Sequence, residues 1–287
     1  MEKVKMKTLA VHLHIYYTKQ LSEVMHYLAN LGDTDYDLYV TLSAENQEVV
    51  DKIKAEYPKA KIWVVENRGY DIGPFIDFLN HINTDDYKYI LKLHTKGKNS
   101  KNYTWLNGNR FNNALWGKVL WDSMLADNRR LSENINILER NDKIGMVGSR
   151  YCFTNSKKDY ANLLPQINAE LKKVGQEPVE KISFIAGSMF LVRAEILAPL
   201  KAYEITDFAS TDGNVKEGTL AHIVERMFGA LVLGQGYEIK AIKHNGYDIY
   251  FAYVALKRFL FQQKITNSGK KLIKICKLPV YSKPLRG

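Results

Sequence analysis

Three positively charged or titratable side chains alternate along one short segment. Lys92, His94 and Lys96 are separated by single residues, so in an extended chain their side chains point to the same side. Cations that converge in this way are suited to neutralise a diphosphate group. Two other roles stay open for His94: it could bind a divalent metal ion, or it could be a buried histidine whose hydrogen bonds are satisfied.

A second candidate cluster lies earlier in the chain, between residues 67 and 74. It reads Asn-Arg-Gly-Tyr-Asp-Ile-Gly-Pro and combines charge with backbone freedom at Gly69 and Gly73. Asp71 stands just before a predicted helix, where a carboxylate commonly caps free backbone N–H groups. Capping alone would explain Asp71. The functional alternative is that Arg68 and Asp71 bind the base, ribose or diphosphate of a nucleotide.

A third candidate cluster lies on a short predicted helix, residues 218–228. Glu217 precedes this helix, and His222 and Glu225 share one face of it because they are three residues apart. A carboxylate or an imidazole in such a place can act as a general base. A helix start with an acidic residue, followed by a surface ion pair with Arg226, would explain the same residues without catalysis.

The elements that must position these clusters follow from hydrophobic periodicity. Between Leu9 and Tyr16, apolar residues alternate with His12 and His14, which predicts a strand. Strand and helix patterns then alternate, bounded by Gly, Pro or polar residues. The predicted strands are residues 9–16, 37–43, 61–66, 87–93, 144–148, 183–192 and 239–242. The predicted helices are residues 21–31, 47–57, one starting at 73, 105–125, 131–138, 161–174 and 218–228.

This alternation with short connections predicts an α/β fold with a mostly parallel sheet flanked by helices. Ligands bind beyond the carboxyl ends of strands in such sheets, and the first two clusters follow predicted strands. Gly187 and Ser188 lie inside the predicted strand 183–192, which indicates a bulge or a close approach of backbone to ligand. Loops are predicted after Lys96 and over residues 151–160 and 203–216.

Composition and missing motifs exclude several classes of protein. The 287 residues contain 46% apolar residues and no clear linker or repeat, which favours a single domain. Cys152 and Cys276 lack metal-ligand spacing, so a reducing, cytoplasmic compartment is expected. The sequence has no phosphate-binding P-loop, no dinucleotide-binding glycine motif after the first strand and no nucleophile elbow. It also has no apolar run of the roughly 18 residues that cross a membrane.

The net charge of +10 is concentrated near the C-terminus. After Asp248 there are nine Lys or Arg residues and no Asp or Glu, so residues 1–248 contain 32 of the 41 basic residues and all 31 acidic ones. A nearly neutral body argues against nucleic acid as a partner. The basic, apolar tail at 249–287 suits the interface of an anionic membrane. The alternative is a packed final helix with a disordered basic end.

Six collinear segments make the sequence resemble the rhamnan synthesis protein F family of bacterial polysaccharide glycosyltransferases. They occur in the family's order and span roughly residues 9–228. They read VHLHIYY, NRGYDIGPF, YILKLHTK, IGMVGS, AGSMFLVRAEIL and EGTLAHIVERMF.

The resemblance implies a GT-A-like fold with a Rossmann-type sheet. It has a nucleotide-sugar half at about 1–150, an acceptor half at about 151–248 and an extension at 249–287. It implies an inverting transfer of a sugar, often L-rhamnose from dTDP-rhamnose, to a growing cell-surface polysaccharide or lipid-linked glycan. The acceptor would lie at the cytoplasmic face of the plasma membrane, with the protein peripheral to it. The alternative is a catalytically inactive sugar- or nucleotide-binding scaffold in a glycan assembly complex.

The resemblance also distributes roles among the candidate residues. The nucleotide-sugar site would consist of Tyr16, Arg68, Gly69, Asp71, Lys92, His94 and Lys96. The acceptor side would include Gly187 and Ser188, and the catalytic candidates are Glu217 as the base, with His222 and Glu225.

One departure from the wider GT-A pattern concerns the metal. Such enzymes usually carry Asp-x-Asp after the fourth strand to hold Mn²⁺ or Mg²⁺, but this chain has Lys92-Leu93-His94 there. The positive charge would then come from the protein, and the missing motif also favours the scaffold alternative. His94 and His244 are the metal-ligand candidates, so dependence on a divalent cation stays open.

Overall fold

The computed structural model describes residues 7–98, 103–106, 109–211, 218–243, 246–265, 270–276 and 278–284. The chain divides into two compact units. The first comprises Met1–Asn107 and Phe111–Lys243, and the second comprises Gly108–Arg110 and His244–Gly287. The domain boundary that the sequence places near residue 248 stays a prediction.

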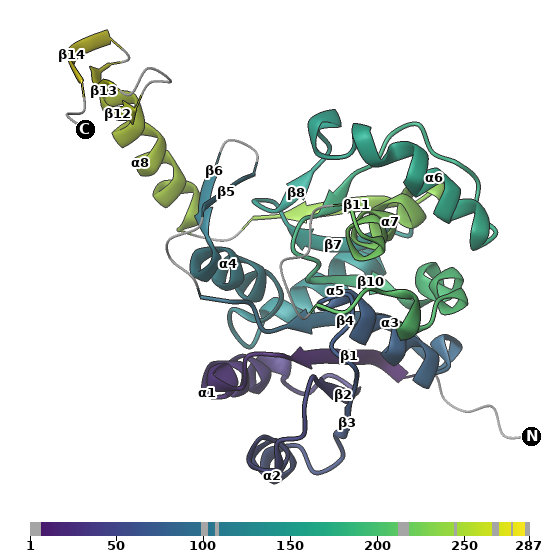
Figure 1. Ribbon diagram of the computed structural model, residues 1–287. Coiled ribbons are helices and arrows are strands. Elements are labelled where there is room, and N and C mark those ends of the chain that lie inside the picture. Colours follow the sequence, from purple (N-terminus) through teal and green to yellow (C-terminus); the bar gives the residue numbers. More distant parts are fainter. Residues whose placement is uncertain are drawn as a thin grey trace, which may run out of the picture. The chain divides into compact units, whose positions relative to one another are not determined.

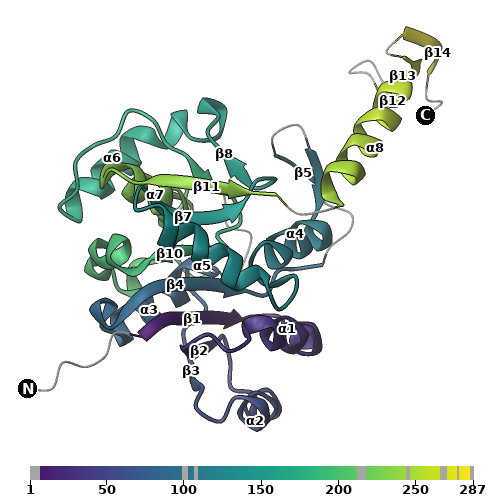
Figure 2. The same cartoon turned by 180° about the vertical axis from the view of Figure 1, so that it is seen from behind.

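In the described part of the first unit, seven strands form the central sheet, in the order β11-β7-β10-β4-β1-β2-β3 (Figures 1 and 2). Strand β10 runs antiparallel to its neighbours β4 and β7, and the other neighbouring pairs are parallel. The predicted α/β fold with a mostly parallel sheet is therefore confirmed. The strands are β1 (Lys7–Ile15), β2 (Tyr36–Leu42), β3 (Lys61–Val64), β4 (Tyr87–His94), β7 (Ile144–Ser149), β10 (Phe190–Arg193) and β11 (Glu238–Ile242).

Helices cover the sheet with apolar residues at helical spacing. Phe75, Phe78 and Leu79 of α3 are fully buried, as expected for one face of an amphipathic helix. Helix α3 packs on β1 and β2 and against α7, while α4 and α5 pack on β7. The α-helices are α1 (Leu21–Leu28), α2 (Gln47–Glu56), α3 (Ile72–His81), α4 (Asn113–Leu125), α5 (Arg130–Arg140), α6 (Leu164–Lys173) and α7 (Leu220–Gly234). The 3₁₀ helices are η1 (Thr18–Gln20), η2 (Ala29–Leu31), η3 (Thr84–Asp86), η4 (Lys157–Asp159), η5 (Ala161–Leu163), η6 (Ala194–Ala202) and η7 (Ile205–Asp207).

One face of the central strands carries a row of buried polar side chains. The row consists of His12 and His14 in β1, Thr41 in β2, and Lys92 and His94 in β4. It faces α3, because the ring of Phe78 stacks on that of His12 with centroids 4.7 Å apart. The ammonium of Lys92 also lies 5.2 Å from the ring centre of Phe75. Since the polar groups are enclosed, each needs partners within the protein.

The predicted strand 183–192 is wrong, because this segment forms two strands in different sheets. Strand β9 (Phe184–Ile185) pairs with β8 (Phe153–Thr154), and β10 joins the central sheet. Between them Gly187 and Ser188 have φ angles of 86° and 50°. A left-handed conformation cannot continue a strand, so the chain turns here.

Other predicted boundaries are also wrong. Residues 105–112 were expected to begin a helix, but strands β5 (Tyr103–Leu106) and β6 (Asn109–Asn112) precede α4. Helix α4 starts at Asn113 because the side chain of Asn112 accepts a hydrogen bond from the backbone N–H of Leu115 at 2.7 Å. Short elements also interrupt the predicted loops at β5, β8, η4 and η7.

The described part of the second unit contains one helix and a three-stranded antiparallel sheet. Helix α8 exposes Ile249, Tyr253, Leu256 and Leu260, whose spacing places them on one face. None of the helices in the described ranges is long and apolar enough to cross a membrane. The elements are α8 (Tyr247–Leu260), β12 (Phe261–Ile265), β13 (Lys270–Ile275) and β14 (Leu278–Pro284).

Candidate functional site

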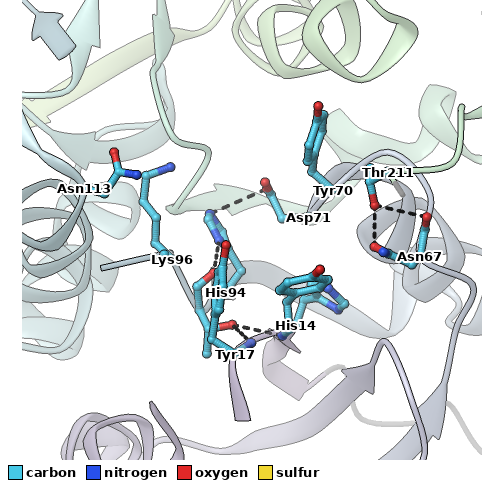
Figure 3. Close-up of a pocket in the computed structure, with 12 residues that line it drawn as sticks. His14, Tyr17, Asn67, Tyr70, Asp71, His94, Lys96, Asn113 and Thr211 are labelled. Atoms are coloured by element: carbon cyan, nitrogen blue, oxygen red, sulfur yellow. Dashed lines mark hydrogen bonds and ion pairs between the residues drawn. The ribbon is translucent and has the colours of Figure 1, made fainter. Parts of the chain in front are cut away.

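A cavity of about 350 Å³ lies beyond the carboxyl ends of β1 and β4 (Figure 3). Its wall includes Tyr16 and Tyr17, which follow β1, and Thr95 and Lys96, which follow β4. These strands are neighbours, while β2 and β3 continue the sheet on the far side of β1, so the winding direction switches between β1 and β4. In open α/β sheets such a switch point creates the crevice where ligands bind.

Three side chains from two segments converge on Asp71 at this cavity. Its Oδ2 accepts hydrogen bonds from Lys92 Nζ, at 2.5 Å, and from the hydroxyl of Ser188. Nε2 of His94 lies 3.6 Å from the same oxygen, a contact marked by a dashed line in Figure 3. The side chain of Lys92 is completely buried, whereas that of Asp71 is 21% exposed. The cluster therefore presents a carboxylate to the cavity with a cation enclosed behind it.

The capping alternative does not explain the side chain of Asp71. The residue does occupy the N-cap position of α3, but its side chain makes no capping hydrogen bond. Its carboxylate turns to Lys92 and Ser188 instead. Lys92 in β4 and Ser188 in the turn before β10 therefore determine the orientation of the Asp71 carboxylate.

The electrostatics of the cluster keep Asp71 ionised. Burial acts to raise the pKa of Asp71, but His94, Lys92 and the hydrogen bonds from Lys92 and Ser188 outweigh it and hold this pKa well below its usual range. Burial lowers the pKa of Lys92, against the opposing effect of Asp71. Asp71 is therefore a permanent hydrogen-bond acceptor and a weak base.

His94 is enclosed by backbone carbonyl groups. Its Nε2 lies 2.9 Å from the carbonyl oxygen of Gly187, and its Nδ1 lies 3.0 Å from that of Thr95. Burial lowers the pKa of His94 to about 4, so the ring is neutral at pH 7 and donates one of these hydrogen bonds. The other nitrogen carries a lone pair that faces the second carbonyl oxygen. His94 is therefore buried, as one of the alternatives from the sequence expected, with only one of its two nitrogens hydrogen-bonded.

The described residues around Asp71 do not fit a divalent cation. A metal ion at His94 would need open space beside the unprotonated nitrogen, but carbonyl oxygens lie 2.9 Å from Nε2 and 3.0 Å from Nδ1. The Lys92 ammonium lies against the Asp71 carboxylate. Among the residues that the structure describes, no group of three His, Cys, Asp or Glu side chains could hold a metal. The second metal candidate, His244, lies outside the described residues.

Two left-handed turns bring the cluster together. Gly69 and Tyr70 have φ angles of 65° and 57°, and Gly187 and Ser188 have φ angles of 86° and 50°. A Cβ atom on either glycine would come within 3 Å of a neighbouring side chain. The conformation costs roughly 1 kcal/mol or more at Tyr70 and at Ser188, and such strain is typical of functional sites.

A second cavity, of about 550 Å³, adjoins the first and shares Tyr70, Asp71 and Lys96 with it. Helix α7 contributes His222 and Glu225 to the wall of this second cavity. The two residues that were predicted to share one face of this helix therefore both line a cavity. The sequence pattern that identified them was their spacing on one helical face.

Glu225 of α7 is hydrogen-bonded to the turn before β10. Oε1 of Glu225 accepts a hydrogen bond of 2.8 Å from the backbone N–H of Gly187, and its other oxygen lies 3.5 Å from the Arg226 guanidinium. His222 Nδ1 lies 2.8 Å from the hydroxyl of Thr219. The predicted base, Glu217, lies outside the described residues.

Lys96 is the cation at the junction of the two cavities. Its Nζ lies 4.0 Å from the ring centre of Trp116, a cation–π contact that fixes its direction. The direct contact with a diphosphate that the sequence predicted for Lys92 does not fit a fully buried side chain. Of this alternating series, Lys96 is the residue whose charge can reach a ligand.

Arg68 is not among the residues that line the two cavities. Its Nε donates to Glu66 at 2.5 Å and its Nη1 donates to the carbonyl of Phe208 at 3.0 Å. The adjacent Asn67 does line the first cavity, where Thr211 donates a hydrogen bond of 2.5 Å to its side-chain oxygen. In this structure Arg68 positions the turn.

Sequence reasoning missed several cavity residues. His14 lies on the predicted strand but was not singled out as a site residue, and Tyr17 stands directly after a predicted one. Asn113, Trp116 and Thr211 come from segments remote in sequence. For these three, no motif or spacing in the sequence indicated the site.

The model of the family described as rhamnan synthesis protein F matches residues 1–237. The chain belongs to this family. The predicted resemblance is therefore confirmed over the whole central sheet except the last strand, β11 (Glu238–Ile242).

Relatives of this rhamnan synthesis protein F family member include longer proteins. The uncharacterized protein WxcX of Xanthomonas campestris pv. campestris is 25% identical over 238 residues in strains B100 and ATCC 33913. The match covers 82% of this chain and 33% of WxcX. The chain thus spans about a third of the length of these curated relatives.

Likenesses among solved structures are distant. The crystal structure of S. aureus TarS 1–349 is 8% identical with a TM-score of 0.43, covering 82% of this chain and 58% of that one. Glucosyl-3-phosphoglycerate synthase from Mycobacterium tuberculosis, in complex with Mn²⁺, uridine-diphosphate and glucosyl-3-phosphoglycerate, is 14% identical with a TM-score of 0.36. That match covers 97% of this chain and 90% of the synthase.

Proposed function

We propose that the protein is a GT-A-like glycosyltransferase that binds a nucleotide sugar in the first cavity and a glycan acceptor in the second. The observation that carries the proposal is the place of the first cavity, at the switch point between β1 and β4. Membership of a family described by rhamnan synthesis supports it. The shared wall of the two cavities would bring donor and acceptor together.

The donor would be held by groups of different chemistry. Residues Tyr16 and Tyr17 are 48% and 42% exposed, and their rings would offer flat surfaces for a base. Lys96, at the junction, would neutralise the diphosphate as negative charge develops on the leaving group, which is electrostatic stabilisation of a transition state. Asp71, ionised and fixed by its buried partners, would accept hydrogen bonds from hydroxyls of the sugar.

The acceptor would lie in the second cavity beside α7. Glu217 is the proposed base that deprotonates the acceptor hydroxyl with inversion at the sugar carbon. His222 and Glu225 would position the acceptor, and Glu225 also holds the turn at Gly187. Glu217→Gln should reduce turnover at least 100-fold and leave donor affinity unchanged. Full turnover by this variant would exclude Glu217 as the base.

Family membership makes L-rhamnose from dTDP-rhamnose the proposed sugar and a cell-surface or lipid-linked glycan the proposed acceptor. The binding test measures the unfolding temperature of the purified protein with a panel of nucleotide sugars, each with Mn²⁺ and with EDTA. A donor at about 100 times its dissociation constant should stabilise the fold by ~2.7 kcal/mol. We expect a selective shift with dTDP-rhamnose that persists in EDTA.

A matched pair of lysine variants controls this measurement. Lys96→Ala should weaken the shift, because the cation at the junction is lost. Lys98→Ala should not, because Lys98 pairs with Glu23 at 2.5 Å and is 54% exposed. Absence of a shift with every nucleotide sugar would exclude the donor site.

The competing function is a scaffold that binds a nucleotide or sugar without turnover. The observation that favours it is Lys92 in the place where GT-A enzymes usually carry a metal-binding aspartate. Donor binding without transfer to any lipid-linked acceptor would support the scaffold. Release of nucleoside diphosphate that depends on acceptor would support the transferase.

The second unit is proposed to bind the inner face of the plasma membrane. The exposed apolar face of α8 and the absence of acidic residues after Asp248 support this. Sedimentation with vesicles that contain phosphatidylglycerol, but not with pure phosphatidylcholine vesicles, is expected. Ile249→Glu with Leu256→Glu should abolish it, and binding unchanged in this double variant would exclude α8 as the contact.

A further inference from the structure

The buried polar row contains a chain of hydrogen bonds that ends at the first cavity. The hydroxyl of Thr41 lies 3.0 Å from Nε2 of His12 and 3.0 Å from Nδ1 of His14. Nε2 of His14 in turn lies 3.3 Å from the hydroxyl of Ser43. His12, His14 and Thr41 are each at most 2% exposed, and His14 lines the cavity.

The unpaired nitrogen of His12 determines the direction of this chain. Nδ1 of His12 is buried and has no hydrogen-bond partner among the described residues. A proton on Nδ1 would leave a buried N–H donor unsatisfied, which is costly, so the proton belongs on Nε2. Nε2–H of His12 then donates to the hydroxyl of Thr41, and that hydroxyl donates its own proton to Nδ1 of His14.

His14 is left with its proton on Nε2. Burial lowers the pKa of His14 to about 3, and burial also holds that of His12 well below its usual range, so each ring carries a single proton at pH 7. The contact of His14 Nε2 with Ser43 is long for a hydrogen bond, at 3.3 Å. A better acceptor inside the cavity can therefore share or replace it.

We propose that Thr41 is a positioning residue that fixes the tautomer of His14, so that His14 offers an Nε2–H donor to the nucleoside diphosphate part of the bound donor. The choice of ligand rests on the proposed function. The contribution of His14 is a directional hydrogen bond without charge, which complements the charge of Lys96. It favours a ligand with an acceptor atom at this point and disfavours one with a donor there.

The tautomer can be read directly from the wild-type protein. Nitrogen-15 NMR of histidine-labelled, ligand-free protein should show His14 protonated at Nε2 and unprotonated at Nδ1. Thr41→Val removes the hydroxyl and keeps the branched shape, so the preference for Nε2–H should weaken. Thr41→Ser keeps the hydroxyl and should preserve it. A His14 ring protonated at Nδ1 in the wild type would overturn the inference.

Binding of dTDP provides the second readout. We expect Thr41→Val to weaken the affinity about 3- to 10-fold, the worth of one neutral hydrogen bond, and Thr41→Ser to match the wild type. The loss in Thr41→Val should be equal at low and high salt. The loss in Lys96→Ala should shrink at high salt, because screening weakens charge interactions.

The outcomes separate this inference from the proposed function. Equal binding of dTDP by the wild type and Thr41→Val would overturn the inference and leave the glycosyltransferase proposal standing. Failure of the wild type to bind dTDP, UDP or GDP would overturn the proposed donor site and the ligand half of the inference with it. The nitrogen-15 spectrum would still decide whether Thr41 fixes the tautomer.

Discussion

The ammonium of Lys92 has no exposed surface and lies 2.5 Å from Asp71. An enclosed cation is tolerated only where a counter-charge and further hydrogen bonds replace water. Asp71 and the hydroxyl of Ser188 supply these. The two charged residues therefore depend on each other for stability, and the exposed edge of Asp71 is what remains for a ligand.

Lys92→Met should lower the free energy of unfolding by about 3–5 kcal/mol, because it leaves the Asp71 carboxylate without its cation. The double variant Asp71→Asn with Lys92→Met should lose less than the sum of the single variants. Urea denaturation measures all three. Lys88→Met is the control, since Lys88 lies on the same strand and is exposed. Equal effects of the changes at 88 and 92 would contradict the ion-pair argument.

For individual residues, the sequence indicated which ones lie at the site more accurately than it indicated what each one does there. Alternation at the end of the predicted strand identified Lys92, His94 and Lys96 as one group, but burial differs among them and depends on packing by α3 and β10. Ser188 was predicted, together with Gly187, to lie at a bulge or a close approach of backbone to ligand. Its hydroxyl contact with Asp71 joins residues 117 positions apart, which no local pattern can reveal.

Helix α7 and strand β9 come into near backbone contact at Gly229. A Cβ atom there would lie 1.8 Å from the carbonyl oxygen of Ser183. Only a glycine allows the helix to approach so closely. This contact therefore fixes how closely β9 approaches α7, the helix that carries His222 and Glu225 into the wall of the second cavity.

Gly229→Ala should therefore destabilise the protein by about 1–3 kcal/mol or more, because the helix must move away from the strand. Gly234→Ala in the same helix is the control. The nearest atom to its Cβ would be 3.8 Å away, at Val179, and alanine there should be neutral or stabilise by up to about 1 kcal/mol. Thermal and urea unfolding compare them, and similar stability of the two variants would disprove the close contact.

Helices and strands were predicted correctly where they depend on residues close in sequence, and incorrectly where they depend on pairing with distant segments. Alternation in β1 and the amphipathic pattern of α1 arise from neighbouring residues, and the sequence predicted both. Strand β10 was merged with β9, because its place depends on pairing with β4 and β7, more than 40 residues away in each case. The antiparallel direction of β10 could not be predicted from the sequence for the same reason.

Across the whole molecule, the enclosed histidines link stability to pH. Burial lowers the pKa of His14 to about 3 and that of His94 to about 4, whereas an unfolded histidine titrates near pH 6.5. Between these values the unfolded chain binds more protons than the folded one, so stability falls as pH is lowered. Asp71 has a lowered pKa, and its contribution is lost only below the unfolded value of roughly 3.9.

The free energy of unfolding should thus decrease from about pH 7 to pH 4, by up to about 1.4 kcal/mol per pH unit for each such histidine. Urea denaturation at several pH values measures this slope. His14→Gln removes one of the titrating groups and should flatten the curve below pH 6. A slope unchanged in His14→Gln would show that His14 is not a source of the acid sensitivity.

Strand β10, which lies between β7 and β4 in the sheet, also determines when the site can form during protein synthesis. Gly187 and Ser188, just before β10, supply partners to His94 and Asp71. A ribosome releases the chain from the N-terminus, so β1 to β4 emerge long before these residues do. A nascent chain consequently holds Asp71 and Lys92 without Ser188, and it cannot assemble the finished carboxylate until residue 188 has left the exit tunnel.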